Sequence, residues 1–192
     1  MKKKDKRGKR KTEILISGFG GQGIMSLGKF LAKAALKEGK CTTYFPSYGA
    51  EVRGGTAHCC VKISDSPIAS PFYDHPDIAL ILNQPSLDKF KKELKKCGIL
   101  ILNSDLISAK NPGDNIRGTS LPLNKIALDC GNIRVANVVA LGALLSLDPG
   151  IFKKETLVNA IKETFKNQNT INQNLKALDK GQALLAKNKE KK

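Results

Sequence analysis

The sequence is poor in the residues that build metal and redox centres. It contains two histidines, no tryptophan and an odd number of cysteines, and no two cysteines have the C-x-x-C spacing of zinc or iron–sulfur ligands. An odd count also argues against a disulfide framework. We expect no metal ligated within this chain, and we expect most of the cysteines to be small buried apolar side chains: Cys41, Cys59, Cys60, Cys97 and Cys130.

The two histidines do not indicate a catalytic group. His58 stands directly before Cys59 and Cys60, too close along the backbone for the spatially assembled Cys–His pair of a thiol enzyme. His75 precedes Pro76 in a run that predicts a turn. We therefore predict no catalytic residue in this chain.

Long apolar runs are also absent. No segment is apolar over the length that spans a membrane, and the N-terminus lacks the apolar stretch of a secretory signal. Both observations predict a cytoplasmic protein with no membrane partner. At 192 residues the chain is long enough for one α/β domain with a proper core and too short for two.

Acidic residues are scarce: 33 Lys and Arg stand against 17 Asp and Glu, which gives a net charge of +16. Two terminal segments hold most of the excess, +7 in residues 1–12 and +3 in residues 185–192, so residues 13–184 carry +6. Such a charge is compatible with nucleic-acid or membrane-surface binding. However, no aromatic residue interleaves the N-terminal run, as a stacking surface for single strands requires. We therefore predict a disordered basic tail at 1–12, one domain at 13–184, a basic tail at 185–192, and no nucleic-acid partner.

Strand and helix patterns alternate along the chain, as in an open sheet with helices packed on its faces. Short apolar runs predict strands at 13–18, 41–45, 56–63, 77–82, 98–102 and 125–129. Helical periodicity predicts helices at 22–38, 86–96, 135–147, 153–167 and 170–187, with a turn-rich excursion at 103–124. The pattern predicts an α/β fold: an open, mostly parallel sheet with helices on both faces and a Rossmann-like Gly-rich turn after the first strand.

A glycine-rich turn follows the first predicted strand. Gly18, Gly20 and Gly23 fit G-x-G-x-x-G between a strand and a helix, with Gly21 and Gln22 inside the pattern. Free N–H groups at the start of the helix make such a turn a ready anion site. The acid that holds the ribose in dinucleotide enzymes is missing, because the first acid after the second strand comes only at residue 51. The turn is therefore either a phosphate-binding loop or a purely structural one.

A second polar, glycine-rich loop covers residues 46–56. It carries hydroxyls, a carboxylate and a guanidinium beside glycines: Ser47, Tyr48, Glu51, Arg53, Gly54, Gly55 and Thr56. A loop after a strand at the same edge as the first turn would face that turn across a ligand crevice. Arg53 can clamp a phosphate or a partner's carboxylate. The alternative is an Arg53–Glu51 salt bridge that orders the loop; we favour the binding role, since a structural loop rarely needs so many polar groups.

The two motifs in this order resemble the γ subunit of the 2-oxoacid:ferredoxin oxidoreductases. The residues that carry the resemblance are Gly18-Phe19-Gly20-Gly21-Gln22-Gly23 and Tyr48-Gly49-Ala50-Glu51-Val52-Arg53-Gly54-Gly55-Thr56. It continues in residues 63–71, in Asn137-Val138-Val139-Ala140-Leu141-Gly142, and in Asn174, Ala177 and Gly181. The resemblance spans residues 13–182, nearly everything but the tails.

The resemblance implies a subunit that is active only with its partners, the α, β and δ subunits of the same complex and, through the complex, ferredoxin. The holoenzyme of this family oxidatively decarboxylates a 2-oxoacid on thiamine diphosphate and Mg²⁺, passes electrons through iron–sulfur clusters to ferredoxin, and transfers the acyl group to the substrate CoA. These cofactors are expected in the partner chains, with none bound by this chain alone. Its loop has the Ser-Tyr-Gly-x-Glu-x-Arg-Gly-Gly form of 2-oxoglutarate and branched-chain types. The expected substrate is therefore 2-oxoglutarate, with 2-oxoisovalerate next and pyruvate or indolepyruvate as further alternatives.

On this resemblance we expect the chain to form the CoA-facing side of the active-site entrance, with residues 20–23 and Arg53 near the CoA phosphates. The candidate contacts are the residues of both motifs: Gly18, Gly20, Gly21, Gln22, Gly23, Ser47, Tyr48, Glu51, Arg53, Gly54, Gly55 and Thr56. One alternative is a purely architectural subunit that touches no ligand. Another, of a different class, is a stand-alone α/β protein that binds a nucleotide or CoA. A subunit predicts a large apolar interface, whereas a stand-alone protein predicts a mostly polar exterior.

Overall fold

The structure is a computed structural model that describes residues 10–47, 56–96, 98–108 and 116–189, with side chains described as far as residue 185. Its strands, α-helices and one 3₁₀ helix (η1) follow one another in this order: β1 (Lys11–Gly18), α1 (Ile24–Lys37), β2 (Cys41–Ser47), β3 (Ala57–Ser64), β4 (Ile78–Ile81), α2 (Gln84–Phe90), β5 (Ile99–Asn103), β6 (Arg117–Leu121), α3 (Leu123–Asp129), η1 (Ile133–Val135), α4 (Ala136–Leu147), α5 (Lys154–Thr164) and α6 (Gln168–Lys189).

The strands form one open sheet in the order β2-β3-β1-β4-β5-β6. β3 runs antiparallel to both of its neighbours, and the other five strands point the same way, so the prediction of a mostly parallel sheet is confirmed. Gly18 of β1 pairs with Ala57, and Ser47 of β2 pairs with His58. The glycine-rich turn and both described ends of the 48–55 loop therefore lie at one edge of the sheet, the carboxyl edge of the parallel strands.

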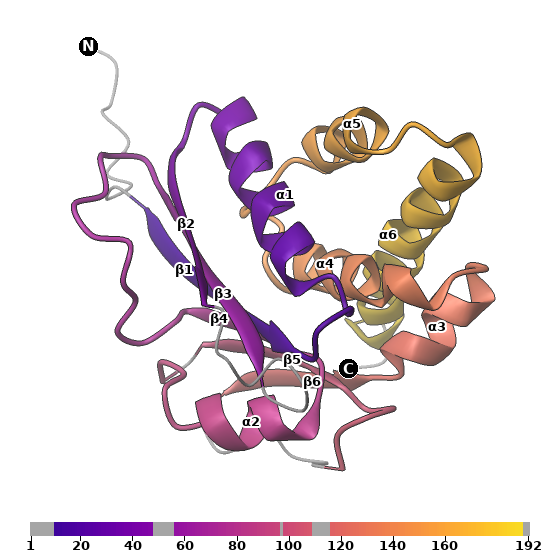
Figure 1. Ribbon diagram of the computed structural model, residues 1–192, viewed down its shortest axis with the longest axis horizontal. Helices are drawn as coiled ribbons and strands as arrows, with labels where there is room; N and C mark the ends of the chain where they lie inside the picture. Colours follow the sequence, from indigo (N-terminus) through magenta and orange to yellow (C-terminus); the bar gives the residue numbers. More distant parts are fainter. Residues whose placement is uncertain (1–9, 48–55, 97, 109–115, 190–192) are drawn as a thin grey trace.

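The two faces of the sheet are covered unequally, as Figure 1 shows: α1 and α3–α6 lie on one face, and α2 lies on the other. The larger core includes Ile14, Ile16 and Leu80 from the strands, and the smaller one includes Leu15, Ile81 and other side chains that point the opposite way. The central strands carry continuous apolar runs, Ile14–Ile16 in β1, all of β4 and Ile99–Leu102 in β5, because both of their faces are buried. Helices on both faces, as predicted, are confirmed.

Helix α1 ends where the sequence predicts. Gly39 follows the helix with φ of 71°, a left-handed conformation that glycine adopts without a Cβ clash. Its backbone N–H donates to the Leu36 carbonyl at 3.0 Å, and the N–H of Lys40 donates to the Ala35 carbonyl at 3.0 Å. This pair of bonds is a Schellman motif, which satisfies the last carbonyls of the helix and turns the chain into β2.

Helices α4 and α6 cross in close contact on the larger face of the sheet. A Cβ on Gly142 of α4 would lie 2.2 Å from the Leu178 carbonyl oxygen, and one on Gly181 of α6 would lie 2.1 Å from the Val139 oxygen. Glycine at these two positions lets the backbones touch. The crossing buries α4 between the sheet and α6, which explains why α4 is apolar around nearly its whole circumference.

The sequence prediction is wrong at residues 125–129, where a strand was expected and the structure has helix α3. The carboxylate of Asp105 accepts from the backbone N–H groups of Asn124 (2.8 Å) and Lys125 (3.0 Å), so a residue from a distant loop caps this helix. The buried side chains follow the i, i+3, i+4 spacing of a helix, which a five-residue window does not reveal: Leu123, Ile126 and Ala127.

The strand missing from the prediction is β6, which lies inside the segment expected to be a turn-rich excursion. Its sequence, Arg-Gly-Thr-Ser-Leu, is polar because β6 is an edge strand, which among the described strands pairs only with β5. The α-helix predicted at 86–96 also ends earlier, at Phe90. At the termini, β1 begins at Lys11, inside the segment predicted as a disordered tail, and α6 continues through Lys189, beyond the predicted domain end.

Candidate functional site

The glycine-rich turn is closed by a hydrogen bond from its backbone to the side chain of Gln22. The Oε1 atom of Gln22 accepts a 2.6 Å hydrogen bond from the backbone N–H of Phe19, and the N–H of Gln22 donates to the Phe19 carbonyl at 3.3 Å. Gly21 and Gly23 have φ of 89° and 74°, which strains any residue with a Cβ. A Cβ on Gly18 would lie 2.4 Å from Gln22 Oε1, so Gly18 leaves room for the side chain that closes the turn.

The turn brings two helix N-termini together. Gly23 is the N-cap of α1, and its carbonyl accepts a 3.2 Å hydrogen bond from Nδ2 of Asn137 in the first turn of α4. Oδ1 of Asn137 accepts from the backbone N–H of Val138 at 2.8 Å. A Cβ on Gly23 would lie 2.4 Å from Asn137 Nδ2, so the contact requires glycine for space as well as for φ. The partial positive ends of α1 and α4 therefore meet at one point, where they favour an anion.

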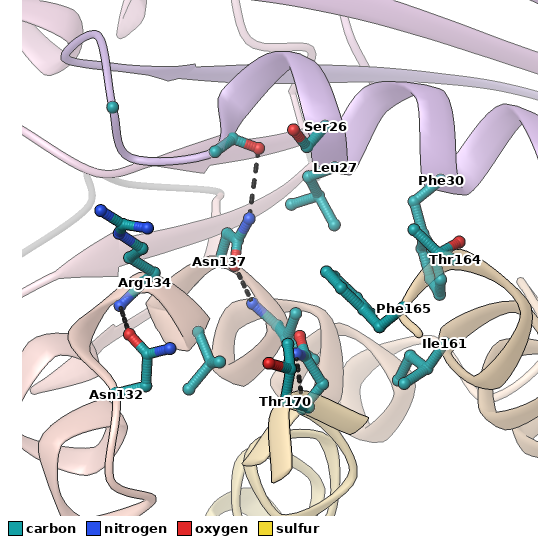
Figure 2. A pocket seen from close by; sticks show the side chains of 15 residues that line it. Ser26, Leu27, Phe30, Asn132, Arg134, Asn137, Ile161, Thr164, Phe165 and Thr170 are labelled. Atoms are coloured by element: carbon teal, nitrogen blue, oxygen red, sulfur yellow. Dashed lines mark hydrogen bonds between the residues drawn. The ribbon is translucent and has the colours of Figure 1, made fainter. Parts of the chain in front are cut away.

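A cavity of about 490 Å³ lies between the turn and the helices of the larger face. Figure 2 shows its two ends: Asn137 lies against the glycine-rich turn with Arg134 and Asn132 on the same side of the cavity, and Phe30, Ile161 and Phe165 lie at the other end. The cavity is lined from α1, the 3₁₀ helix and the helices α4–α6: Gly21, Gly23, Ser26, Leu27, Phe30, Asn132, Arg134, Val135, Asn137, Val138, Ile161, Thr164, Phe165, Thr170 and Asn174. One end is thus polar and cationic, and the other is apolar.

Arg134 is the cation of the polar end. Oδ1 of Asn132 accepts a 3.0 Å hydrogen bond from the backbone N–H of Arg134, and Nδ2 of Asn132 donates to Oε1 of Gln173 at 3.2 Å. These bonds fix the short 3₁₀ helix against α6 and leave the Arg134 side chain exposed. Within the described part of the chain, the guanidinium has no carboxylate partner, so its charge is available to a ligand.

The two predicted motifs have different outcomes. Gly21 and Gly23 line the cavity, whereas Gly18, Gly20 and Gln22 belong to the turn outside its lining. Ser47 and Thr56 lie at the carboxyl edge of the sheet and do not line the cavity. The remaining predicted residues fall outside the described residues, so their role stays a prediction: Tyr48, Glu51, Arg53, Gly54 and Gly55.

The cysteines beside His58 are buried, as predicted, and point to opposite faces of β3. Burial raises the pKa of the Cys59 and Cys60 thiols to about 12, so neither is a thiolate at neutral pH. The His58 ring packs against Phe90 with centroids 4.8 Å apart, and burial, followed by the charge of Lys89, lowers its pKa. In the described ranges, no three His, Cys, Asp or Glu side chains are grouped to hold a metal ion. No described helix is long and apolar enough to cross a membrane.

A model of the pyruvate ferredoxin/flavodoxin oxidoreductase family matches residues 13–184. The chain belongs to this family. Subunit KorC of 2-oxoglutarate synthase from Methanocaldococcus jannaschii is 39% identical over 179 residues, which cover 92% of this chain and 95% of KorC. Ketoisovalerate oxidoreductase subunit VorA from Methanothermobacter thermautotrophicus is 40% identical over 171 residues, 88% of this chain. The chain spans 35% of the length of that VorA.

Solved structures of the family share the fold. The γ subunit of the keto/oxoacid ferredoxin oxidoreductase from Geobacter sulfurreducens superposes with a TM-score of 0.79 at 36% identity, over 91% of this chain and 99% of that one. The 2-oxoglutarate:ferredoxin oxidoreductase from Magnetococcus marinus, solved with 2-oxoglutarate, coenzyme A and succinyl-CoA, matches with a TM-score of 0.83 at 26% identity. That match covers 93% of this chain and 31% of the other. The resemblance to γ subunits of 2-oxoacid:ferredoxin oxidoreductases is confirmed.

The structure gives physical roles to the family motifs in α4 and α6. Asn137 joins α4 to the turn, Gly142 and Gly181 let α4 and α6 touch, and Asn174 donates from Nδ2 to the Thr170 carbonyl at 2.8 Å beside the cavity. Arg134 was missed by the sequence reasoning, which expected Arg53 to be the cation. No local pattern marks Arg134, because its place at the cavity depends on the packing of the 3₁₀ helix.

Proposed function

We propose that this chain is the γ subunit of a 2-oxoglutarate:ferredoxin oxidoreductase and forms the CoA-facing side of its active site. The reaction is the CoA-dependent oxidative decarboxylation of 2-oxoglutarate to succinyl-CoA with reduction of ferredoxin. The observation that carries the proposal is the cavity in which two helix N-termini and the exposed Arg134 converge at one end while the other end is apolar. CoA matches these two ends, because its nucleotide half has anionic phosphate groups beside an apolar adenine ring.

The cavity residues fit the nucleotide half of CoA in chemical type. The N–H groups at the start of α1 and the guanidinium of Arg134 suit phosphate oxygens. Phe30 and Phe165 offer apolar surface to the adenine ring. The thiol end of CoA would leave the cavity toward the partner subunits, where the holoenzyme's thiamine diphosphate, Mg²⁺ and iron–sulfur clusters supply decarboxylation and electron transfer. This chain binds, orients and desolvates the acyl acceptor.

The choice of 2-oxoacid is supported by the loop at residues 47–55, whose form is that of 2-oxoglutarate and branched-chain types. The similarity to KorC supports 2-oxoglutarate, and the similarity to VorA supports 2-oxoisovalerate as the alternative. Pyruvate is a further alternative, because subunit PorC of pyruvate synthase from Methanothermobacter thermautotrophicus is 32% identical over 156 residues.

A subunit is favoured over a stand-alone CoA- or nucleotide-binding protein by exposed apolar surface. Several large apolar side chains are exposed among the described residues, from 36% for Phe45 to 65% for Phe72, and they are distributed over several elements: Phe19, Leu36, Phe45, Phe72, Leu106, Leu128 and Ile133. Two of them, Phe45 and Phe72, lie together with ring centroids 4.9 Å apart, and exposed aromatic residues of this kind suit contacts with other subunits. We place this chain in a complex with α, β and δ partners that delivers electrons to ferredoxin.

The complex, purified anaerobically through this chain, tests the proposal. Its CoA-dependent reduction of a viologen dye is measured with 2-oxoglutarate, 2-oxoisovalerate, pyruvate and indolepyruvate. Arg134→Ala should raise the KM for CoA about tenfold or more, because a hydrogen bond to a charged group contributes about 1.5–3 kcal/mol. The KM for the 2-oxoacid should not change, and Arg53→Ala should act in the same direction as Arg134→Ala.

Lys33→Ala is the matched control, because Lys33 is an exposed cation of α1 outside the cavity. Its KM for CoA should match that of the parent complex. If Arg134→Ala and Arg53→Ala assemble normally and leave this KM unchanged, the subunit is architectural. If the chain elutes alone as an inactive monomer, the subunit assignment itself fails.

A further inference from the structure

A second hollow, of about 340 Å³, lies at the edge of the sheet opposite the glycine-rich turn. It is formed where four parallel strands begin: β1 at Lys11, β4 at Ile78, β5 at Ile99 and β6 at Arg117. Five of its lining residues are cationic and two are anionic: Arg10, Lys11, Lys95, Lys96 and Arg117, with Asp77 and Asp148. The family assignment and the proposed CoA site make no use of this hollow.

The carboxylates at the hollow hold some of its cations in place. Lys95 Nζ pairs with Asp77 Oδ1 at 2.8 Å, and Arg10 pairs with Asp148. Lys11 Nζ pairs with Glu13 Oε1 at 2.6 Å, outside the lining. Lys96 and Arg117 have no carboxylate partner among the residues that the structure describes. Two positive charges are therefore uncompensated, on separate segments of the chain that meet at one hollow.

Arg117 is positioned by backbone contacts. Its N–H donates to the Gly98 carbonyl at 2.9 Å, and its Nη2 donates to the Leu147 carbonyl at 2.9 Å. The guanidinium has five N–H donors, so this single bond orients it and leaves others for a ligand. Gly98 also shapes the hollow, because a Cβ there would lie 2.8 Å from the Lys95 carbonyl and 2.9 Å from that of Asp77. The tight packing at Gly98 keeps the Lys95–Lys96 segment against the start of β5.

We propose that this basic hollow binds a small anion that carries two or more phosphate groups. Lys96 and Arg117 belong to two different segments, so a ligand with two or more charged groups can engage both cations at once. None of the described residues that line the hollow is aromatic, which favours a compact polyphosphate over a single-stranded nucleic acid.

The full-length chain tests this proposal in a calorimetric titration with inorganic pyrophosphate at about 0.15 M salt, an ionic strength that screens exposed charges over about 8 Å. Pyrophosphate should bind, and orthophosphate should bind about tenfold or more weakly because it offers one phosphate group. The double variant Lys96→Ala/Arg117→Ala should weaken pyrophosphate binding about tenfold or more, since it removes the uncompensated donors. Lys96→Ala alone should weaken binding in the same direction, and it leaves the Arg117–Leu147 contact intact.

The matched control is Lys91→Ala/Lys92→Ala, which removes the same charge from exposed lysines outside the hollow. Its affinity for pyrophosphate should stay within about twofold of the parent value, because neither lysine lines the hollow and salt screens the charge of exposed side chains. Equal losses in the two double variants would overturn the proposal and assign the binding to the general positive charge. The absence of any pyrophosphate binding by the parent chain would overturn it as well.

Discussion

At the scale of the residue, the fold buries two charged side chains, Glu13 and Lys62, as an ion pair in the sheet. Lys62 is 3% exposed and Glu13 7%, and their charged atoms lie 3.2 Å apart. Lys11 adds a 2.6 Å contact to the same Glu13 oxygen, and Lys62 Nζ also donates to the Phe72 carbonyl. Burial raises the pKa of Glu13, but hydrogen bonds from Lys11 and Lys62 outweigh it and hold that pKa below its usual value of 4.5.

When folding lowers the pKa of a carboxyl group, the ionised group stabilises the folded protein at pH values above its pKa in the unfolded chain. This stability is lost as the pH falls through the pKa of the group in the folded protein. Glu13→Gln removes this titrating group, so the free energy of unfolding should fall less steeply with pH below about pH 4.5. At neutral pH the same change should lower the free energy of unfolding by about 3–5 kcal/mol, because Lys62 stays buried without its partner. Urea unfolding at pH 3 to 8 measures both effects. Glu163→Gln is the control: it breaks the exposed pair with Lys37 and should cost about 1 kcal/mol or less. A similar cost for both variants would contradict the account.

At the scale of the element, the α4–α6 crossing sets the distance between two helices. Gly142→Ala places a Cβ against the Leu178 carbonyl, and Gly181→Ala places one against the Val139 carbonyl. Each should lower the free energy of unfolding by about 1–3 kcal/mol, because the strain of overpacking exceeds the gain in helix propensity. The double variant should cost less than the sum, since the first Cβ already separates the helices for the second. Urea unfolding of the two single variants and the double variant gives the coupling free energy between the two positions. If the two single costs add up to the cost of the double variant, the two glycines do not share one crossing.

The elements also show what the sequence allows one to predict. The apolar runs within β1, β4 and β5 predict strands correctly, because burial on both faces of the sheet favours consecutive apolar side chains. The polar edge strand β6 carries no such pattern, and α3 is too short for its periodicity to show. The candidate site divides in the same way. The sequence predicts the glycine-rich turn because its residues are close together in the chain. The cavity could not be predicted, because it depends on the contact between Gly23 and Asn137, 114 residues apart, and on packing around Arg134.

At the scale of the whole molecule, the proposed cavity and the exposed aromatic pair Phe45–Phe72 lie on different faces of one sheet. The two rings pack edge to face with centroids 4.9 Å apart, and Phe45 belongs to β2, an outer strand that leads to the carboxyl edge at Ser47. Exposed aromatic residues are enriched in protein interfaces. We expect this pair to contact a partner subunit near the edge where the polar loop begins.

Phe45→Ser/Phe72→Ser should therefore weaken assembly of the complex about tenfold or more, because burying one large apolar side chain contributes about 1.5–3 kcal/mol. Leu36→Ser is the control: Leu36 is also exposed, at 61%, but it lies alone at the end of α1 away from the carboxyl edge, so the change should leave assembly unchanged. The fraction of each variant retained by the partner subunits in size-exclusion chromatography measures the effect, and circular dichroism checks that the chain folds. Full retention of the double variant would place the partner contact on another surface, and loss of retention for Leu36→Ser would place it at the end of α1.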